Sequence, residues 1–352
     1  MEKGDNREAI AKLAGQQKLQ RHEWRALLTQ LDKEEQEQLR RQAVATATSK
    51  FGQGIYIRGL IEISSYCRNN CYYCGLRCSN NNAHRYRLTR EEILDSCRRG
   101  AEIGFNTFVL QGGEDPGQSD EWIAETVRAI HDLYPDKAIT LSVGERSDEA
   151  YRTFRRAGAT RYLLRHETRN DAHYSMLHPA NMSGSNRRKC LDTLKREGYQ
   201  TGAGMMIGSP GQTTEQIIDD LEYLDEFRPE MIGIGPFIPA TGTPFANEPA
   251  GSVTTTINII SLLRLRHPDA LIPATTALAT LHPEGRKLAI QAGANVVMPN
   301  LTPSTVRSKY AIYNNKASTG CESAEEIEKL EKELNSIGYH INYSRGDHKP
   351  TE

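Results

Sequence analysis

Short apolar runs separated by longer amphipathic stretches extend over most of this chain. The first run, over residues 55–63, alternates in polarity and is rich in β-branched residues, which predicts a β-strand. Comparable runs give about eight predicted strands, at 55–63, 106–111, 138–143, 160–166, 201–207, 230–235, 271–275 and 294–298. Because strands that alternate with helices pair in parallel through right-handed crossovers, they predict an α/β fold, a closed (β/α)8 TIM-type barrel. A doubly wound open sheet is the alternative, but polar residues follow nearly every strand, as expected at a barrel mouth.

Glycine marks the places where a predicted helix turns back into a strand. These glycines occupy positions that commonly need a positive φ, and they are Gly104, Gly158, Gly198 and Gly293. Helix starts are marked as well, because the segments beginning at Thr89 and Thr213 both have the sequence of a capping box.

The two ends of the chain differ from this repeating pattern. Residues 1–50 are charged and have apolar residues at helical spacing, so we expect a helical cap across the bottom of the barrel. Residues 51–308 hold the predicted barrel. Residues 309–352 form a polar C-terminal extension with a helix over 324–337 and a tail that we expect to be poorly ordered.

Composition excludes several classes of partner. The 352 residues carry a formal net charge of −1, so no basic surface argues for nucleic acid. No apolar run approaches the roughly 18 residues that a membrane span needs, and no secretory signal peptide is visible. The 7 cysteines, an odd number, fit a reducing cytoplasm better than a disulfide framework, so we expect a cytoplasmic protein.

The loop after the first predicted strand carries three closely spaced thiols, those of Cys67, Cys71 and Cys74. Thiolates at this density suit zinc or an iron–sulfur cluster. Structural zinc normally takes four ligands, whereas a cubane held by three thiolates keeps one iron open for another ligand. Cys78 could supply a fourth thiolate. A zinc knuckle, an electron-transfer cluster and unligated core cysteines therefore remain open as interpretations of the spacing.

The arrangement Cys-x3-Cys-x2-Cys, with the aromatic Tyr73 before the last cysteine, resembles the signature of radical S-adenosylmethionine (SAM) enzymes. This resemblance implies one 4Fe–4S cluster on Cys67, Cys71 and Cys74, with the amino and carboxylate groups of SAM on the fourth iron. In that family the reduced cluster cleaves the sulfonium of SAM and generates a 5′-deoxyadenosyl radical. Cys78 is then a bystander rather than a ligand.

Polar residues at two later strand ends could complete a site. Adjacent glycines before Glu114 let backbone groups approach a ligand closely, although a tight turn is the simpler explanation. The fourth predicted strand ends in Arg165, His166 and Glu167, where buried charges without partners would be costly. Arg187, on the helix that follows, could bind a carboxylate in bidentate fashion.

The order of the motifs between about residues 50 and 315 resembles one branch of these enzymes, the HydE family of FeFe-hydrogenase maturases. The matching segments include Arg-Tyr-Arg from Arg85, Gly-Glu-Asp-Pro from Gly113 and Met-Pro-Asn-Leu-Thr-Pro from Met298. The resemblance implies contacts to SAM at Gly112, Gly113, Glu114, Glu167, Arg187 and Met205. It implies contacts to the carboxylate and amine of a small amino-acid-derived substrate at Arg58, Thr140, Arg165, Thr275, Thr276 and Tyr310.

The family substrate is understood to be a cysteine-bound Fe(CO)2CN synthon that a partner maturase makes. The resemblance therefore implies an organometallic or amino-acid-derived substrate, a reductant such as ferredoxin or flavodoxin, and other hydrogenase maturases as partners. Some family members hold a second cluster on three C-terminal cysteines. Here Cys321 alone remains in that region, so we expect no second cluster.

Two other functions remain open from the residues alone. A 3-methylornithine synthase, which rearranges lysine, shares the Arg-Tyr-Arg-Leu-Thr and Gly-Glu-Asp-Pro segments. A non-enzymatic iron–sulfur scaffold or electron carrier would instead bind a cluster whose irons all have protein ligands.

Overall fold

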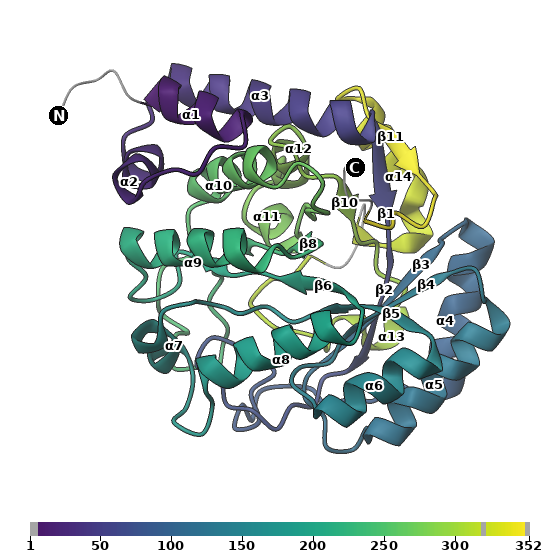
Figure 1. The fold of residues 1–352 in the computed structure, drawn as a ribbon. Helices are drawn as coiled ribbons and strands as arrows, with labels where there is room; N and C mark the ends of the chain where they lie inside the picture. The colour runs from purple at the N-terminus through teal and green to yellow at the C-terminus, as the bar shows by residue number, and fades with distance from the viewer. Residues whose placement is uncertain (1–5, 318–321, 349–352) are drawn as a thin grey trace.

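A computed structural model describes residues 6–317 and 322–348, and its centre is a ring of parallel strands surrounded by helices (Figure 1). Arg58 interrupts the first strand and separates β1 (Gly54–Ile57) from β2 (Gly59–Ser64). The other strands are β3 (Thr107–Gly112), β4 (Ala138–Ser142), β5 (Ala159–Leu163), β6 (Gln200–Ala203), β7 (Met206–Ile207), β8 (Met231–Ile232), β9 (Gly235–Pro236), β10 (Val296–Val297) and β11 (His340–Asn342).

The helices alternate with these strands over most of the chain. In order they are α1 (Asn6–Ala14), α2 (Arg21–Thr29), α3 (Lys33–Phe51), α4 (Arg90–Ile103), α5 (Asp120–Leu133), α6 (Asp148–Ala157), α7 (Asp171–Leu177), α8 (Gly184–Arg196), α9 (Thr214–Phe227), α10 (Val253–Arg266), α11 (Thr276–Leu281), α12 (Gly285–Ile290), α13 (Ser304–Arg307), the short 3-10 helix η2 (Ala324–Glu326) and α14 (Ile327–Asn335).

The strands close into a barrel. One sheet runs in the order β2-β3-β4-β5-β6-β8 with every pair parallel. Parallel bridges continue from β8 through Leu271 and Pro273 to β10, which pairs with β1, and a bridge from Leu60 to Asn300 completes the ring. The predicted (β/α)8 barrel is therefore confirmed. The strand expected at 271–275 is reduced to isolated bridges, because Pro273 has no N–H to donate to a ladder.

The predicted joints are confirmed as well. All four joint glycines have a positive φ, and Gly104 and Gly158 end α4 and α6 in the left-handed conformation. Thr89 and Thr213 each form a complete capping box at the start of α4 and α9. These local signals set where each helix ends and where the next strand enters the barrel.

The N-terminal helices pack against α9 and α10 (Figure 1). Helix α10 is buried on most of its surface, so it needs a second helical layer beyond the strands. Arg21 of α2 makes ion pairs with three carboxylates of α9, and these partners are Glu215, Asp219 and Glu222. These ion pairs fix α2 to α9.

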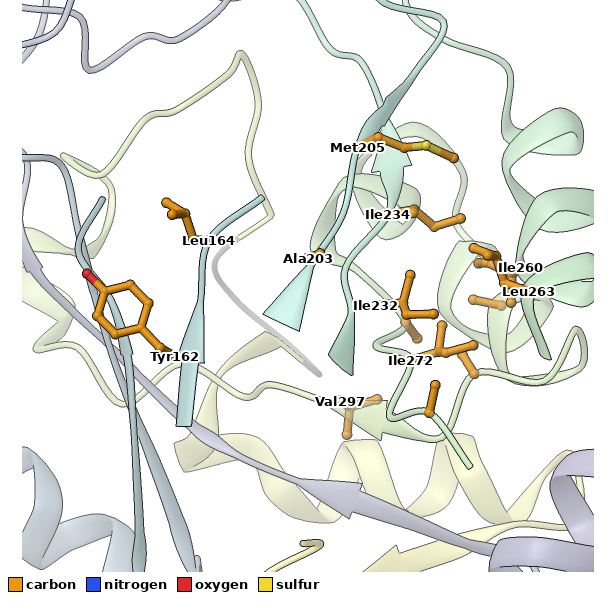
Figure 2. Packing of buried hydrophobic residues seen from close by; sticks show 14 of the residues in the cluster. Tyr162, Leu164, Ala203, Met205, Ile232, Ile234, Ile260, Leu263, Ile272 and Val297 are labelled. Atoms are coloured by element: carbon orange, nitrogen blue, oxygen red, sulfur yellow. The ribbon is translucent and has the colours of Figure 1, made fainter. Parts of the chain in front are cut away.

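Apolar side chains on the outer face of the strands pack against the surrounding helices. Figure 2 shows Ile232, Ile234 and Ile272 gathered beside Ile260 and Leu263 of α10, and all five are buried. Tyr162 and Leu164 lie on the neighbouring side of the same core. The inner faces of the strands are thereby left for the polar residues of the barrel interior.

The C-terminal segment closes the bottom of the barrel. Strand β11 adds in parallel to β1, on the side away from β10 (Figure 1). The chain then passes below the strands, where Thr107 Oγ1 donates to the Arg345 carbonyl at 2.9 Å. The fully buried Arg161 of β5 pairs with Asp347 at 2.6 Å.

These contacts differ from the poorly ordered tail that we expected, because the buried guanidinium of Arg161 requires a carboxylate. The expectation for 349–352 lies outside the described residues. The division into cap, barrel and extension stays a prediction. None of the helices within 6–317 and 322–348 combines the length and apolar character that crossing a membrane would require.

Candidate cluster and ligand site

The loop after β2 presents Cys67, Cys71 and Cys74 as free, partly buried thiols at the carboxyl end of the first strand. Backbone hydrogen bonds fix this loop to three separate parts of the barrel mouth. They are Arg68 N to Glu114 O, Tyr72 N to Leu177 O and Gly75 N to Ile312 O, each 2.9 Å long. The loop is therefore anchored on both sides of the thiols, which limits how far they can move.

Burial raises the pKa of all three thiols, and neighbouring sulfur atoms add to the effect at Cys71 and Cys74. The pKa of Cys74 rises to about 12, through burial and then through the charge of Cys67. The pKa of Cys71 lies well above its ordinary value, through burial and then Cys74, and Arg187 acts in the opposite direction. A cationic centre is therefore needed to hold the three groups as thiolates at neutral pH, and its binding releases protons.

The chemistry of these donors fits a cubane. Within the described ranges, no set of three or more His, Cys, Asp or Glu side chains converges on a single metal ion. A cubane differs, because each iron takes one thiolate and its ligands surround a larger object. Cys78 is exposed, while Cys97 and Cys190 are buried in the core. Cys321 lies outside the described residues.

An aromatic wall beside the cysteine loop was missed by the sequence analysis. Tyr73 lies edge-on to His178, and its hydroxyl is 3.2 Å from His178 Nε2. The ring of His178 stacks on Tyr174, and burial lowers the pKa of His178 to about 4. The imidazole is therefore neutral at pH 7. A spacing of about 100 residues between Tyr73 and His178 left no local signal to connect them.

The glycine segment after β3 packs directly against the cysteine loop. A Cβ on Gly113 would lie 2.4 Å from the Tyr66 carbonyl oxygen and 2.6 Å from Cys67 Cβ. The two segments can approach this closely because Gly113 carries no side chain at the contact. The carboxylate of Glu114 accepts from Arg68 Nε at 3.0 Å and from the backbone N–H of Glu145 at 2.8 Å. Gly112 and Gly113 thus leave backbone groups, rather than the Glu114 carboxylate, for a ligand.

Glu167 is held in an unusual backbone conformation at the end of the fourth barrel strand. Its φ is 65°, and its N–H donates to the Gly204 carbonyl at 3.0 Å. A non-glycine residue in this region stores backbone strain of a kind that clusters at ligand sites. Its Oε2 lies 3.1 Å from Arg165 Nη2, yet neither atom makes a hydrogen bond with favourable geometry.

Arg187 lies buried behind this strand end. Its Nε donates to Glu145 Oε1 at 2.6 Å, and its Nη1 donates to the Arg165 carbonyl at 3.3 Å. Burial opposes its charge, but Tyr174, Glu145 and other neighbours outweigh that effect and hold its pKa above the ordinary value. Arg165, Glu167 and Arg187 therefore form one group of charges next to the cysteine loop. The assignment of Glu167 and Arg187 as SAM contacts stays a prediction.

Several substrate residues named from the resemblance point unpartnered polar atoms into buried space. These atoms are Thr140 Oγ1, Arg165 Nε and Nη2, and Thr275 Oγ1. Thr275 lies against β9, because a Cβ on Gly235 would be 2.9 Å from its hydroxyl. The hydroxyl of Tyr310 accepts from Gln111 Nε2 at 3.3 Å. Buried donors without partners are costly unless a ligand supplies acceptors, so the interior fits an anionic group.

Thr276 differs from its neighbour. Its hydroxyl donates to Glu322 Oε2 at 2.7 Å, so it is already occupied within the chain. Glu322 in turn pairs with the buried Arg286. The structure therefore separates the two threonines and leaves Thr275 alone available to a ligand.

Arg58 lies at a different level of the barrel from Arg165. Its Nη1 donates to Met231 Sδ at 3.0 Å, and its Nε and Nη2 have no hydrogen-bond partner. Burial lowers the pKa of Arg58, with Arg161 acting in the same direction and Asp347 against it. Its charged neighbours thus belong to the bottom of the barrel, and the structure does not bring it to the other predicted substrate contacts.

The SAM contact expected at Met205 stays a prediction. Its side chain is fully buried in the main core and lies beside Ile234 (Figure 2). Met206 instead packs with Leu177 and Phe237 against Tyr73. Because side chains alternate along a strand, a shift of one residue exchanges the core face for the site face.

Comparisons with known proteins agree with the chemistry of this site. The family model described as the radical SAM superfamily matches residues 61–224, which include the cysteine loop. The FeFe-hydrogenase maturase subunit HydE of Thermotoga maritima is 48% identical over 265 residues, which cover 75% of each chain. A 3-methylornithine synthase of Methanosarcina acetivorans is 30% identical over 316 residues, covering 89% of this chain and 88% of that protein.

Solved structures show the same architecture. A crystal structure of methylornithine synthase (PylB) superposes with a TM-score of 0.85 at 28% identity, covering 95% of this chain and 97% of that one. The FeFe-hydrogenase maturase HydG superposes with a TM-score of 0.83 at 21% identity, covering 98% of this chain and 77% of that one. The second likeness concerns the fold alone.

Proposed function

This chain belongs to the radical SAM superfamily and, within it, to the HydE family, and on that premise we propose that it cleaves SAM reductively during assembly of a hydrogenase diiron centre. The observation that carries the proposal is the anchored loop of Cys67, Cys71 and Cys74 next to buried donors that lack partners. A metal-only or purely structural role would not require such donors in the barrel interior.

When bound, the 4Fe–4S cluster and SAM supply the electron and the sulfonium whose cleavage yields a 5′-deoxyadenosyl radical. The three cysteines hold the cluster and leave its fourth iron to SAM. Glu167 and Arg187 offer a carboxylate and a guanidinium to the amino acid part of SAM, and the backbone of Gly112 and Gly113 approaches the same ligand. Met206, beside Tyr73, takes the adenosyl-side role that the sequence analysis gave to Met205.

We assign the substrate to the barrel interior below this site. Arg165 Nε and Nη2, with the hydroxyls of Thr140 and Thr275, present donors suited to a carboxylate. Tyr310 limits the same space from the C-terminal side. A cysteine-bound Fe(CO)2CN synthon has the required carboxylate. The enclosing strands keep water away from the reacting groups, which protects a radical from side reactions.

The remaining assignments follow from the same family membership. We propose ferredoxin or flavodoxin as the electron donor, other hydrogenase maturases as partners, and a cytoplasmic location. We propose no second cluster, because Cys321 is the one cysteine of the C-terminal region. No role in nucleic acid or membrane binding is proposed.

The test is anaerobic reconstitution of the full chain with iron and sulfide, reduction by dithionite and addition of SAM. We expect 5′-deoxyadenosine, and we expect SAM to change the EPR spectrum of the reduced cluster, because it binds the open iron. Cys78→Ala serves as the control and should retain both signals. An unchanged EPR spectrum together with absence of 5′-deoxyadenosine would identify an iron–sulfur scaffold or electron carrier instead.

The methylornithine synthase alternative rests on its matching fold and its identity of 30%. The two functions are distinguished by giving the reconstituted protein lysine in one reaction and the iron–cysteine complex in another. Consumption of the complex supports the maturase assignment. Formation of 3-methylornithine from lysine would replace it.

A further inference from the structure

The upper barrel contains a buried ion pair that none of the roles above uses. Lys316 Nζ lies 2.6 Å from Glu62 Oε1, and the two side chains are 8% and 0% exposed. Asn300 Nδ2 donates to the other carboxylate oxygen of Glu62 at 3.0 Å. Glu62 lies on β2 and faces the same side as Arg58, because side chains alternate along the strand. The pair is therefore inside the barrel.

The pair lies next to the proposed reaction chamber. Gln111, which donates to the Tyr310 hydroxyl, is the register partner of Glu62 across β2 and β3. The ammonium of Lys316 is 5.6 Å from the centre of the Tyr310 ring. Tyr310 thus connects the ion pair with the space below the cysteine loop.

Lys316 belongs to residues 309–317, which cross the barrel mouth and which we call the strap. Ile312 accepts from Gly75 N of the cysteine loop at 2.9 Å, and Asn314 N donates to the Pro239 carbonyl at 3.0 Å. Ala317 N donates to Thr280 Oγ1 at 3.1 Å. The strap therefore joins the cysteine loop to the opposite rim of the mouth.

We propose that Lys316 is a positioning residue, whose ion pair with Glu62 holds the strap across the mouth and keeps Tyr310 against the substrate. The effect of Lys316 on catalysis rests on the proposed function, whereas its role in holding the strap does not. The other anchors of the strap are hydrogen bonds along the rim, whereas Lys316 and Glu62 are a buried pair of opposite charges. Removal of one partner leaves the other charge uncompensated, so it disfavours the closed arrangement strongly.

The closure is tested in the full chain without cluster or SAM, by hydrogen exchange. Lys316→Met should raise the exchange rate across the strap about tenfold or more, because local opening then costs less free energy. Lys309→Met is the matched control, since it removes the same charge from the same segment and no ion pair of Lys309 is found within the described residues. Lys316→Arg should restore slow exchange. Equal exchange in Lys316→Met and Lys309→Met would overturn the proposal.

A second measurement tests the consequence for chemistry. In the reconstituted protein, Lys316→Met should still form 5′-deoxyadenosine, while the substrate consumed per 5′-deoxyadenosine falls about tenfold. Lys316→Arg should recover most of this ratio. An unchanged ratio in Lys316→Met overturns the positioning role. If the unaltered chain forms no 5′-deoxyadenosine, the proposed function fails, and hydrogen exchange alone still decides whether Lys316 holds the strap.

Discussion

Two arginines near opposite ends of one barrel strand have contrasting surroundings. Arg161, within β5, is fully buried and donates to Thr107 Oγ1 at 3.1 Å, in addition to its pair with Asp347 at 2.6 Å. Arg165, just beyond β5, keeps both Nε and Nη2 without a hydrogen bond. Each arginine has a carboxylate of the chain nearby, but Arg161 makes a hydrogen bond to its carboxylate, whereas Arg165 Nη2 lies 3.1 Å from Glu167 Oε2 without a hydrogen bond and is left for a ligand.

This difference shows that a position inside the barrel does not by itself mark a functional charge. Both arginines occupy the interior face of the barrel, and both would be costly without an anion. The informative property is whether the protein itself satisfies the donors. Arg58 is intermediate, since two of its nitrogen atoms lack partners but its charged neighbours are those of the bottom.

The largest expected effect lies at the mouth. Cys71→Ala should abolish 5′-deoxyadenosine formation, because the cluster then loses one of its three thiolate ligands. The free energy of unfolding of the chain without its cluster should change by about 1 kcal/mol or less, since a partly buried thiol is replaced by a methyl group. Iron content, EPR and urea unfolding measure these effects. Iron content and SAM cleavage equal to those of Cys78→Ala would contradict the ligand assignment.

The next effect compares the two arginines directly. Arg165→Gln should raise the KM for substrate about 100-fold, because about 3 kcal/mol of charge-assisted hydrogen bonding to an anion is lost. SAM cleavage should persist. Arg161→Gln should leave that KM within about twofold and should lower the free energy of unfolding, because Asp347 loses its buried partner. If KM rises in Arg161→Gln and not in Arg165→Gln, the substrate binds near Arg161 at the bottom of the barrel rather than near Arg165 at the mouth.

The barrel and the cysteine loop could be predicted from the sequence, whereas the contrast between Arg161 and Arg165 could not. The barrel followed from the strand periodicity, and the cysteine loop from local spacing. Asp347 could not be placed, because its polar surroundings in the sequence resemble a solvated tail and its partner Arg161 lies 186 positions away. The choice between Met205 and Met206 as the proposed SAM contact could not be made from the sequence, since an apolar strand end gives no sign of which face meets the ligand.

Asp347→Asn tests the bottom of the barrel. It should lower the free energy of unfolding by about 2 kcal/mol, less than for a fully buried pair, because Asp347 is 32% exposed. SAM cleavage and the KM for substrate should stay within about twofold, since the change is remote from the mouth. Urea unfolding and steady-state kinetics give both values. A change in KM without loss of stability would contradict the contrast between the two ends.

The same pair predicts a pH dependence. Burial favours the neutral form of Asp347, but the hydrogen bond and charge of Arg161 outweigh it and hold the pKa below the ordinary value. The carboxylate therefore contributes full stability above about pH 4 and loses it as the pH falls through the lowered pKa. The difference in unfolding free energy between the unaltered chain and Asp347→Asn should shrink below about pH 4. A constant difference from pH 7 to pH 3 would exclude this linkage.

The smallest effects distinguish the two adjacent threonines at the mouth. Thr275→Val removes a hydroxyl without a partner, so stability should be unchanged or slightly higher, while the KM for substrate rises about fivefold through the loss of about 1 kcal/mol of hydrogen bonding. Thr276→Val should leave KM unchanged and should cost about 1–2 kcal/mol of stability, because Glu322 Oε2 loses its donor. Valine keeps the branched shape at both positions, so the pair compares hydroxyl groups alone. If both variants shift KM equally, Thr276 also contacts the ligand, and the ligand site extends onto the first turn of α11.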